Sequence, residues 1–409
     1  MKAEIIAVGN EIITGNAVNS NAAYIAKAML QVGIRVCFHS AVGDYAKDIH
    51  NALKIALERV DMVIFIGGLG PTEDDLTKET VSTFSNKELI LDKDTAEKIE
   101  EHFKKRGMEM PKSNYKQALF PEKAYILKND NGTAPGCTFM YKNKHIVLLP
   151  GPPKELIPMV EQRLIPYFKN ISNDHYCTID TKLWGIGESL AAKKLAHLLG
   201  EYESYSVAPY VNNTELIIRT IAHSKDKNEA YQLAEKIKKE IASCLGEYII
   251  GYNDKSLEDS ILDLLDKYQY TIATVESCTG GMLASSLVSC SGISKYFSEG
   301  IITYSNAAKI KYAKVNKETL DQYGAVSKQT AKEMAEGIKS VSGAQIGLST
   351  TGIAGPTGAT KDKPVGLVYI GIALPDQTHV FELHLSGSRE NIRQATVRNI
   401  LYRLYTLLK

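Results

Sequence analysis

The stretch Tyr270-Thr-Ile-Ala-Thr-Val-Glu-Ser-Cys-Thr-Gly-Gly281 sets the architecture of the last third of the chain. Its first half, residues 270–275, is an apolar run typical of a buried strand, and the small residues after it predict a turn into an amphipathic helix. A serine on such a turn is held above the sheet, where backbone N–H groups and the positive helix end can face a developing oxyanion. Ser277 therefore reads as a candidate nucleophile.

A second strand-to-helix junction follows at residues 298–309, Ser-Glu-Gly-Ile-Ile-Thr-Tyr-Ser-Asn-Ala-Ala-Lys. Residues 298–304 predict a strand, and Asn306 is the expected N-cap of the next helix. If the two strands are parallel neighbours, Tyr304 and Lys309 lie near Ser277 at the carboxyl edge, where open α/β sheets bind ligands. Lys309 could accept the serine proton if burial or a nearby cation lowers its pKa from about 10.4 toward roughly 7 to 8. Tyr304 could relay that proton or donate to the oxyanion.

Simpler interpretations of the same residues stay open at this point. Ser277 and Thr279 are typical helix caps, Tyr304 could be a sheet aromatic, and Lys309 could be a solvated helix residue. Cys278 is a competing nucleophile, because a cysteine at a helix N-terminus can have a lowered pKa. The nine histidines form no His-Glu-x-x-His or His-x-His cluster, which argues against a catalytic zinc amidase.

Three motifs in order resemble the C-terminal domain of the CinA family, the nicotinamide mononucleotide deamidases. They are Glu-Ser-Cys-Thr-Gly-Gly (276–281), Ile-Thr-Tyr-Ser-Asn-Ala-Ala-Lys (302–309) and Thr-Gly-Ile-Ala-Gly-Pro (351–356). The resemblance covers residues 253–409 and implies that Ser277 is the nucleophile, that Tyr304 and Lys309 complete the site, and that the site needs no cofactor. Residues of the motifs and of the last helix are then expected to bind substrate: Thr279, Gly280, Thr351, Gly352, Gly355 and Arg389.

Several of these residues are of types that commonly bind a phosphate group. The glycine-rich loop 351–358 could receive a phosphate through backbone donors, although it could also be an ordinary loop. Arg389 and Arg393 stand near the start of the predicted closing helix 391–408, and an arginine fork matches phosphate geometry. The loop position and the family's pattern favour Arg389, which leaves Arg393 as a surface ion pair.

The N-terminal part has the rhythm of a doubly wound α/β domain. Its strands are expected at residues 2–9, 35–42 and 61–68, with helices at 19–31 and 46–59. The segment 67–79, Gly-Gly-Leu-Gly-Pro-Thr-Glu-Asp-Asp-Leu-Thr-Lys-Glu, is neither a P-loop nor a G-x-G-x-x-G fingerprint, yet its glycines could cradle a phosphate at a helix start. Asp74 and Asp75 could hold a hard divalent cation there. Equally, they could be the acidic residues that favour any first helical turn.

Four segments of this part resemble the N-terminal domain of the CinA family, which is similar to the molybdopterin-binding fold. They are Val-Gly-Asn-Glu-Ile-Ile-Thr-Gly (8–15), Val-Gly-Asp (42–44), Gly-Gly-Leu-Gly-Pro-Thr-Glu-Asp-Asp (67–75) and Leu-Pro-Gly-Pro-Pro (149–153). The resemblance implies an ADP-ribose pyrophosphatase that uses a divalent metal ion. Asp75 is then the catalytic carboxylate. Metal or water would be positioned by Asp44, Asp75 and Glu79, and phosphate would be bound by Gly68, Gly70 and Thr72.

Two connecting segments complete the chain. The turn-rich loop 129–136 could be a wall of the nucleotide pocket or only a connection between strands. Residues 171–252 predict a small α+β unit, with strands at 176–182 and 213–221 and helices at 188–199 and 227–245, and resemble the KH-like middle domain of CinA. Trp184-Gly185-Ile186-Gly187 lacks the Gly-x-x-Gly spacing of an RNA-binding loop, which favours a spacer or dimerisation element. We therefore expect three domains, at residues 1–170, 171–252 and 253–409.

The composition of the chain limits its possible binding partners, cysteine-based sites and cellular location. With 48 Lys+Arg against 47 Asp+Glu, the chain carries a formal charge of +1, so no excess of positive charge indicates binding to nucleic acid or an anionic membrane. Six scattered cysteines without a Cys-x-x-Cys pair indicate neither a disulfide framework nor a thiolate zinc site. No signal-peptide or membrane-spanning run stands out, so a cytoplasmic protein that binds small molecules is expected.

These observations lead to two functional hypotheses. The first is a homodimeric, bifunctional pyridine-nucleotide salvage enzyme, which hydrolyses the amide of nicotinamide mononucleotide and the diphosphate of ADP-ribose. The second is a nucleotide-binding protein in which one site or neither is active, and which acts through partners in competence or DNA repair.

Overall fold

The computed structural model describes residues 1–169, 171, 174–212 and 215–409. The chain divides into two compact units, and stretches of the middle segment contribute to both. The first unit comprises Met1–Thr178, Tyr202–Tyr205 and Ile221–Lys236. The second comprises Ile179–Glu201, Ser206–Thr220 and Ile237–Lys409. Over the part of the chain that is described, no helix has the length and apolar character needed to cross a membrane.

A six-stranded sheet organises the first unit, in the order β2-β1-β3-β8-β7-β6. Its parallel strands are β2 (Arg35–Val42), β1 (Lys2–Val8), β3 (Met62–Ile66) and β8 (Lys144–Leu149). Strands β7 (Gly136–Tyr141) and β6 (Tyr125–Leu127) add an antiparallel edge. All five residues of β3 are buried, as expected for a parallel strand covered on both faces.

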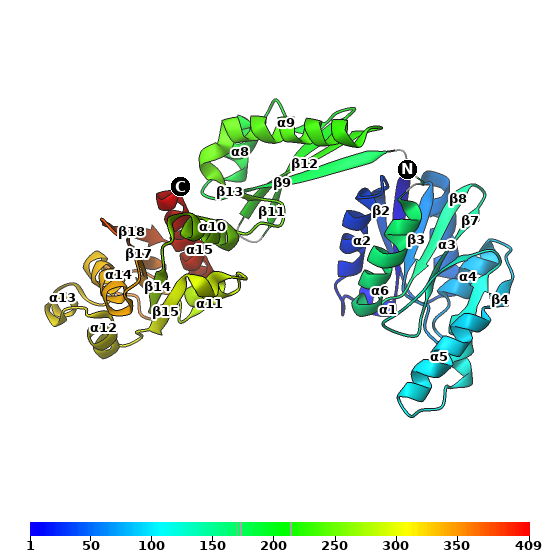
Figure 1. Ribbon diagram of the computed structural model, residues 1–409, viewed down its shortest axis with the longest axis horizontal. Coiled ribbons are helices and arrows are strands. Elements are labelled where there is room, and N and C mark those ends of the chain that lie inside the picture. The colour runs from blue at the N-terminus through cyan, green and yellow to red at the C-terminus, as the bar shows by residue number, and fades with distance from the viewer. Residues whose placement is uncertain (170, 172–173, 213–214) are drawn as a thin grey trace. The chain divides into compact units, whose positions relative to one another are not determined.

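Helices cover both faces of this sheet. Helices α2 (Ser20–Leu30) and α6 (Pro153–Met159) pack on one face, and α3 (Ala46–Arg59) and α4 (Thr77–Phe84) pack on the other (Figure 1). The remaining elements are α1 (Asn10–Ile13), β4 (Leu89–Leu91), α5 (Lys93–Lys105), η1 (Lys112–Ala118), β5 (Leu119–Pro121), η2 (Val160–Leu164) and α7 (Ile165–Phe168). The doubly wound α/β domain expected from the sequence is confirmed.

The middle segment is the small α+β unit that the sequence predicts, with a sheet in the order β10-β11-β12-β9-β13. Its elements are β9 (His175–Leu183), α8 (Glu188–Lys194), β10 (Gly200–Glu201), β11 (Tyr205–Asn212), β12 (Glu215–Ser224), α9 (Lys227–Leu245), η3 (Gly246–Tyr248) and β13 (Ile249–Tyr252). Helix α8 ends earlier than the predicted residue 199, and β11 was not predicted. The start of the predicted strand 213–221, residues 213 and 214, lies outside the described residues.

A five-stranded sheet in the order β15-β14-β16-β17-β18 forms the centre of the C-terminal domain. Strands β15 (Phe297–Ile302), β14 (Ile272–Glu276) and β16 (Ile346–Gly352) are parallel. Strands β17 (Leu367–Ala373) and β18 (Thr378–His384) add an antiparallel edge. Glu276 pairs with Ile302 on one side and Thr350 on the other, so the carboxyl ends of the three parallel strands meet at one edge.

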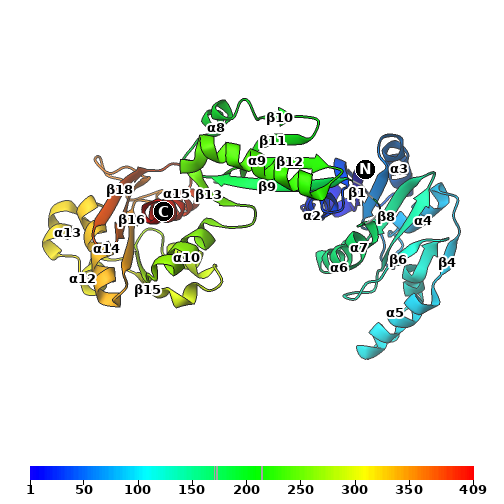
Figure 2. The same cartoon turned by 45° about the horizontal axis from the view of Figure 1, so that its top comes forward.

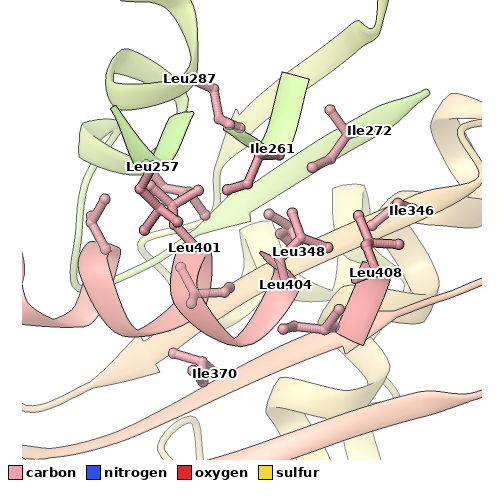
Figure 3. Packing of buried hydrophobic residues seen from close by; sticks show 14 of the residues in the cluster. Leu257, Ile261, Ile272, Leu287, Ile346, Leu348, Ile370, Leu401, Leu404 and Leu408 are labelled. Atoms are coloured by element: carbon pink, nitrogen blue, oxygen red, sulfur yellow. The ribbon is translucent and has the colours of Figure 1, made fainter. Parts of the chain in front are cut away.

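Two helical layers enclose this sheet (Figure 2). Helices α10 (Leu257–Tyr268), α11 (Met282–Val288) and α15 (Arg389–Leu408) pack with Ile272 and Leu348 on one face, as the side chains in Figure 3 show. Helices α12 (Asn306–Ala313), α13 (Lys317–Tyr323) and α14 (Lys328–Ser342) cover the other face, and η4 (Ile293–Lys295) precedes β15. Alternate residues of β14 thus serve two separate apolar layers.

Candidate active site

The turn after β14 holds the predicted nucleophile. The backbone N–H of Ser277 donates to the Thr350 carbonyl on the neighbouring strand (3.0 Å), which ties the start of the turn to the sheet. Gly280 and Gly281 follow with φ angles of 60° and 93°, a left-handed conformation that glycine adopts without the steric cost of a side chain. The Gly-Gly pair therefore allows the chain to turn from the strand into α11.

Lys309 reaches this turn from α12. Its Nζ lies 3.0 Å from Ser277 Oγ and donates to the Thr303 carbonyl at 2.7 Å. The lysine side chain is only 1% exposed. Burial lowers the pKa of Lys309 from the ordinary lysine value of 10.5 to about 8. A neutral amine is therefore accessible near physiological pH, beside the hydroxyl that it would deprotonate.

The start of α12 differs from the prediction by one residue. The N-cap is Ser305, whose Oγ accepts a hydrogen bond from the Ala308 N–H (3.1 Å), and Asn306 is the first helical residue. Serine caps helices as well as asparagine does, so the sequence alone gave little reason to choose between them. Lys309 remains in the first turn, above the end of β15.

Cys278 lies next to the nucleophile but has the wrong environment for thiolate chemistry. Its side chain is buried, and burial raises the pKa of the thiol to about 12. A reactive cysteine needs a lowered pKa. The structure therefore favours Ser277 over Cys278 as the nucleophile of this turn.

Tyr304 is placed beside Arg389 and is 66% exposed. Its hydroxyl accepts a hydrogen bond from Arg389 Nη2 (3.2 Å), while Arg389 Nη1 donates to the Gly355 carbonyl (2.8 Å). Arg389 thus joins the loop after β15 to the glycine-rich loop after β16. These three predicted residues come together, but the Tyr304 hydroxyl contacts the arginine rather than Ser277.

Three predicted substrate-binding residues have structural roles for their side chains or Cα atoms. Thr351 is 1% exposed, and its hydroxyl donates to the Ala325 carbonyl (2.7 Å), so it is not free to bind substrate. At Gly352, an added Cβ would lie 2.6 Å from a Val368 methyl group, so glycine lets β16 and β17 approach. The buried hydroxyls of Thr279 and Thr350 share a hydrogen bond of 2.6 Å. Gly280, Gly355 and Arg389 remain candidates for direct contact.

Two further side chains hold the nucleophile turn, and the sequence analysis assigned neither of them to it. Glu276 is buried and accepts hydrogen bonds from backbone N–H groups at the start of α11. Arg393, expected to be a surface ion pair, does approach Glu390 (3.4 Å) but also donates to the Thr279 carbonyl (2.8 Å). An acidic residue shortly before a helix start is the only local signal that pointed to Glu276. The positive end of α11 is thus occupied by a carboxylate, which corrects the expectation that it faces an oxyanion.

A second candidate site lies in the first unit, where β1, β3 and β8 end. A cavity of about 460 Å³ opens there, bounded by the glycine-rich segment after β3 and by Asp44, Asp74 and Asp75. Thr133 and Ala134 also line it, so the loop 129–136 is a wall of this pocket. The cavity has the position expected for ligand binding in an open α/β sheet.

The predicted phosphate residues differ in their surroundings. Gly68 and Gly70 line the cavity, and an added Cβ at Gly70 would lie 2.4 Å from the Asp75 carboxylate. Thr72 does not line it. Its N–H and hydroxyl donate to Asp75 Oδ2 at 3.0 and 2.5 Å, so Thr72 orients the aspartate. Asp44 is held likewise by the Asn10 N–H (2.8 Å), a contact that the sequence did not predict.

Glu79 does not join Asp44 and Asp75. It pairs with Lys116 (3.4 Å), whose Nζ also donates to the carbonyls of Thr72 and Asp75. Across residues 1–169, 171, 174–212 and 215–409, no three His, Cys, Asp or Glu side chains gather closely enough to hold a metal ion. The three-carboxylate group suggested by the sequence is therefore not formed, whereas Asp44 and Asp75 both face the cavity.

Family models match all three parts of the chain. The probable molybdopterin binding domain matches residues 4–170, the damage-inducible protein CinA KH domain 180–251, and the CinA C-terminal domain 254–408. Fold and family models together define an α/β protein with a molybdopterin-binding-like domain, a KH-like segment and a CinA C-terminal domain.

Relatives match over nearly the full length. A putative competence-damage inducible protein of Clostridium novyi is 47% identical, with 97% of this chain and 96% of the relative covered. A CinA-like protein of Dictyoglomus thermophilum is 44% identical, with 98% of each covered. A solved competence/damage inducible protein of Agrobacterium tumefaciens is 38% identical, covering 37% of this chain and 95% of that one, with a TM-score of 0.36. The chain belongs to the CinA family.

Proposed function

We propose that the C-terminal site hydrolyses the carboxamide of nicotinamide mononucleotide, giving nicotinate mononucleotide and ammonia. The observation that carries this proposal is the contact between Lys309 Nζ and Ser277 Oγ (3.0 Å), made by a buried lysine whose pKa is about 8. A serine needs an adjacent base to act as a nucleophile, and a desolvated lysine is one way to supply it. The position of the pair at the carboxyl edge of a parallel sheet adds support.

In the proposed reaction, neutral Lys309 accepts the Ser277 hydroxyl proton as Oγ attacks the carboxamide carbon. The tetrahedral intermediate collapses when Lys309 returns the proton to the leaving nitrogen, and ammonia departs. Water then attacks the ester with Lys309 again as base, which releases the acid and restores the serine. The Thr303 carbonyl keeps Nζ at the nucleophile throughout. Arg389, tied to Gly355 and Tyr304, is the proposed partner of the nucleotide phosphate.

Ammonia release from nicotinamide mononucleotide by the full chain, with and without EDTA, tests this assignment. We expect release that EDTA does not affect and that Ser277→Ala lowers by about 10³-fold or more. Cys278→Ala is the matched control on the neighbouring residue and should stay within about threefold of wild type. Normal turnover by Ser277→Ala, or a Cys278→Ala protein that loses activity while remaining folded, would contradict the proposal.

For the N-terminal cavity we propose hydrolysis of the ADP-ribose diphosphate to AMP and ribose 5-phosphate. It is supported by a glycine-rich segment and two oriented carboxylates, Asp44 and Asp75, around one cavity at the sheet edge. Magnesium-type ions are commonly bound by one or two carboxylates together with substrate phosphates, so this donor set fits such an ion. A bound divalent ion would neutralise charge on the diphosphate. The chain's own part is to bind phosphate through the backbone at Gly68 and Gly70 and to orient water with Asp75.

Asp75→Asn tests this second activity, with Glu73→Gln on the same loop as the control. We expect Asp75→Asn to lower AMP formation by about 100-fold or more, and Glu73→Gln, an exposed residue, to have little effect. Calorimetric titration with ADP-ribose separates the alternatives. Binding without turnover by the wild-type protein would favour a nucleotide-binding protein over the enzyme. Sedimentation of the full chain tests the proposed homodimer.

A further inference from the structure

A buried acidic residue, Glu276, lies directly before the nucleophile as the last residue of β14. Its side chain is 1% exposed. Glu276 Oε2 accepts hydrogen bonds from the N–H groups of Gly281 and Leu283, both at 3.0 Å, and Oε1 accepts one from Ala284 at 2.8 Å. These N–H groups belong to the first turn of α11, where a helix has no partners of its own for them. One side chain therefore connects the end of the strand directly to the start of the helix.

The hydrogen bonds of Glu276 close the nucleophile turn into a ring. The turn, Ser277 to Gly280, begins at the residue after Glu276 and ends at the residue before Gly281, whose N–H the carboxylate holds. Its middle is fixed at Thr279, where the hydroxyl meets Thr350 and the carbonyl accepts from Arg393. Charge-assisted hydrogen bonds to a buried carboxylate are stronger than neutral ones. The Glu276 contacts are thus well suited to keep the turn in one conformation.

The carboxylate also determines which backbone donors stay open. The N–H groups of Gly281, Leu283 and Ala284 are occupied by Glu276 and cannot bind an oxyanion. In contrast, the N–H group of Gly280, an exposed residue of the turn, has no protein acceptor within the described part of the chain. Gly280 follows Ser277 by three residues in the same turn. Donors of this kind are the usual means of stabilising the oxyanion in acyl transfer.

We propose that Glu276 is a positioning residue for amide hydrolysis at Ser277. It holds the turn so that Ser277 Oγ stays at Lys309 Nζ, and it leaves the Gly280 N–H group to bind the tetrahedral oxyanion. Glu276 exchanges no proton and touches no substrate. The inference rests on the proposed amidase function, and it assigns the oxyanion site to the turn itself and not to the helix end.

The test compares Glu276→Gln with Glu258→Gln in the full chain. A glutamine side chain has the same shape, but its NH₂ group cannot accept a hydrogen bond. At least one of the backbone N–H groups that donate to Glu276 would therefore lose its acceptor. Glu258 is the matched control because it is also buried and bonds to the same helix, through Ser286 Oγ (2.6 Å), but away from the turn. Four quantities are measured: kcat and KM for nicotinamide mononucleotide, the rate of Ser277 sulfonylation by phenylmethylsulfonyl fluoride, and Tm.

We expect Glu276→Gln to lower kcat by about 10- to 100-fold with KM changed by less than about threefold, because misplacing reacting groups affects mainly the chemical step. Sulfonylation of Ser277 should slow as well, and Glu258→Gln should leave both rates near wild type. Equal rate losses in the two variants, in proportion to equal losses in Tm, would show a merely structural role and overturn the proposal. Wild-type kcat in folded Glu276→Gln would overturn it too.

Two provisions keep the outcome decisive. If Glu276→Gln does not fold, Glu276→Asp keeps the charge but shortens the reach, and the same loss in kcat with unchanged KM is expected of it. If the wild-type protein does not act on nicotinamide mononucleotide, the amidase proposal fails. The sulfonylation rates still test whether Glu276 positions Ser277.

Discussion

The amino group of Lys309 shows how burial of one side chain can create a base. In water a lysine amine is protonated at neutral pH, whereas here burial brings its pKa to about 8. Only the neutral form accepts the Ser277 proton, so kcat/KM should rise with pH through about 8 and then level off. The measurement is the pH profile of ammonia release. A profile that is flat from pH 6 to 10 would contradict this role.

The same burial should cost stability. Lowering the lysine pKa from 10.5 to about 8 corresponds to roughly 3 kcal/mol against folding where the lysine is otherwise charged. Between these two values the unfolded chain binds more protons than the folded one, so the cost is full below about pH 8 and fades toward pH 10.5. Lys309→Met should therefore abolish amidase activity yet raise the free energy of unfolding at pH 7 by about 1–3 kcal/mol.

Urea denaturation at pH 7 and pH 10 measures this effect, with Lys311→Met as the control. Lys311 lies on the same helix but is exposed, so its replacement should change neither activity nor its pH profile. A Lys309→Met protein that is less stable than wild type at pH 7 would mean that the hydrogen bonds to Thr303 and Ser277 outweigh the cost of desolvation.

The position of Lys309 depends on how its helix, α12, packs against the neighbouring helix α14. Helix α12 ends against α14, where a Cβ added at Gly337 would lie 1.7 Å from the Ala313 carbonyl oxygen. Alanine favours a helix interior over glycine by about 1 kcal/mol, but this contact with backbone cannot be relieved by a side-chain rotation. We expect Gly337→Ala to lower the free energy of unfolding by about 1–3 kcal/mol and to reduce kcat by displacing α12.

Urea unfolding and amidase kinetics of Gly337→Ala check this prediction. Ser340→Ala is the control on the same helix, because Ser340 is exposed and should gain a little helix stability without any change in kcat. If Gly337→Ala were stabilising, helix propensity would outweigh the steric contact.

Across the second compact unit, one arginine links the middle segment to the C-terminal domain. Arg398 on α15 pairs with Glu215 of β12 (2.8 Å) and with Glu258 of α10 (3.2 Å). Removing one partner of a part-buried ion pair leaves the other charges unpaired, so Arg398→Met should lower the free energy of unfolding by about 2–4 kcal/mol. Arg403→Met, an exposed residue over the Phe381 ring, should cost less than about 1 kcal/mol.

A double-mutant cycle of Arg398→Met with Glu215→Gln isolates the contact between the two segments. A coupling energy near zero would mean that the pair contributes nothing and that other contacts, such as Trp184 with Tyr402, join the two segments. A clear coupling would support the interpretation of the middle segment as a structural support for the amidase domain.

Much of the architecture could be read from local patterns. Apolar runs at 270–275 and 298–304 predicted two strands, and in the structure these strands are parallel neighbours. The turn at Ser277 and the position of Lys309 one helical turn beyond the next strand also followed from spacing. These features depend on residues close together in the chain, where periodicity and turn chemistry act directly.

The hydrogen-bond and ion-pair partners of side chains could not be predicted in this way, because they depend on segments far apart in the sequence. No residue near Thr351 in the sequence predicts its hydrogen bond to the Ala325 carbonyl, and none near Glu79 predicts its ion pair with Lys116. Arg393 contacts Thr279 only because α15 packs beside the turn. The order of residues in the chain thus predicted the strands, the turn, and a candidate nucleophile and base. Which polar groups remain free for a substrate was settled by three-dimensional packing, since a buried donor or acceptor bonds to whatever the fold places beside it.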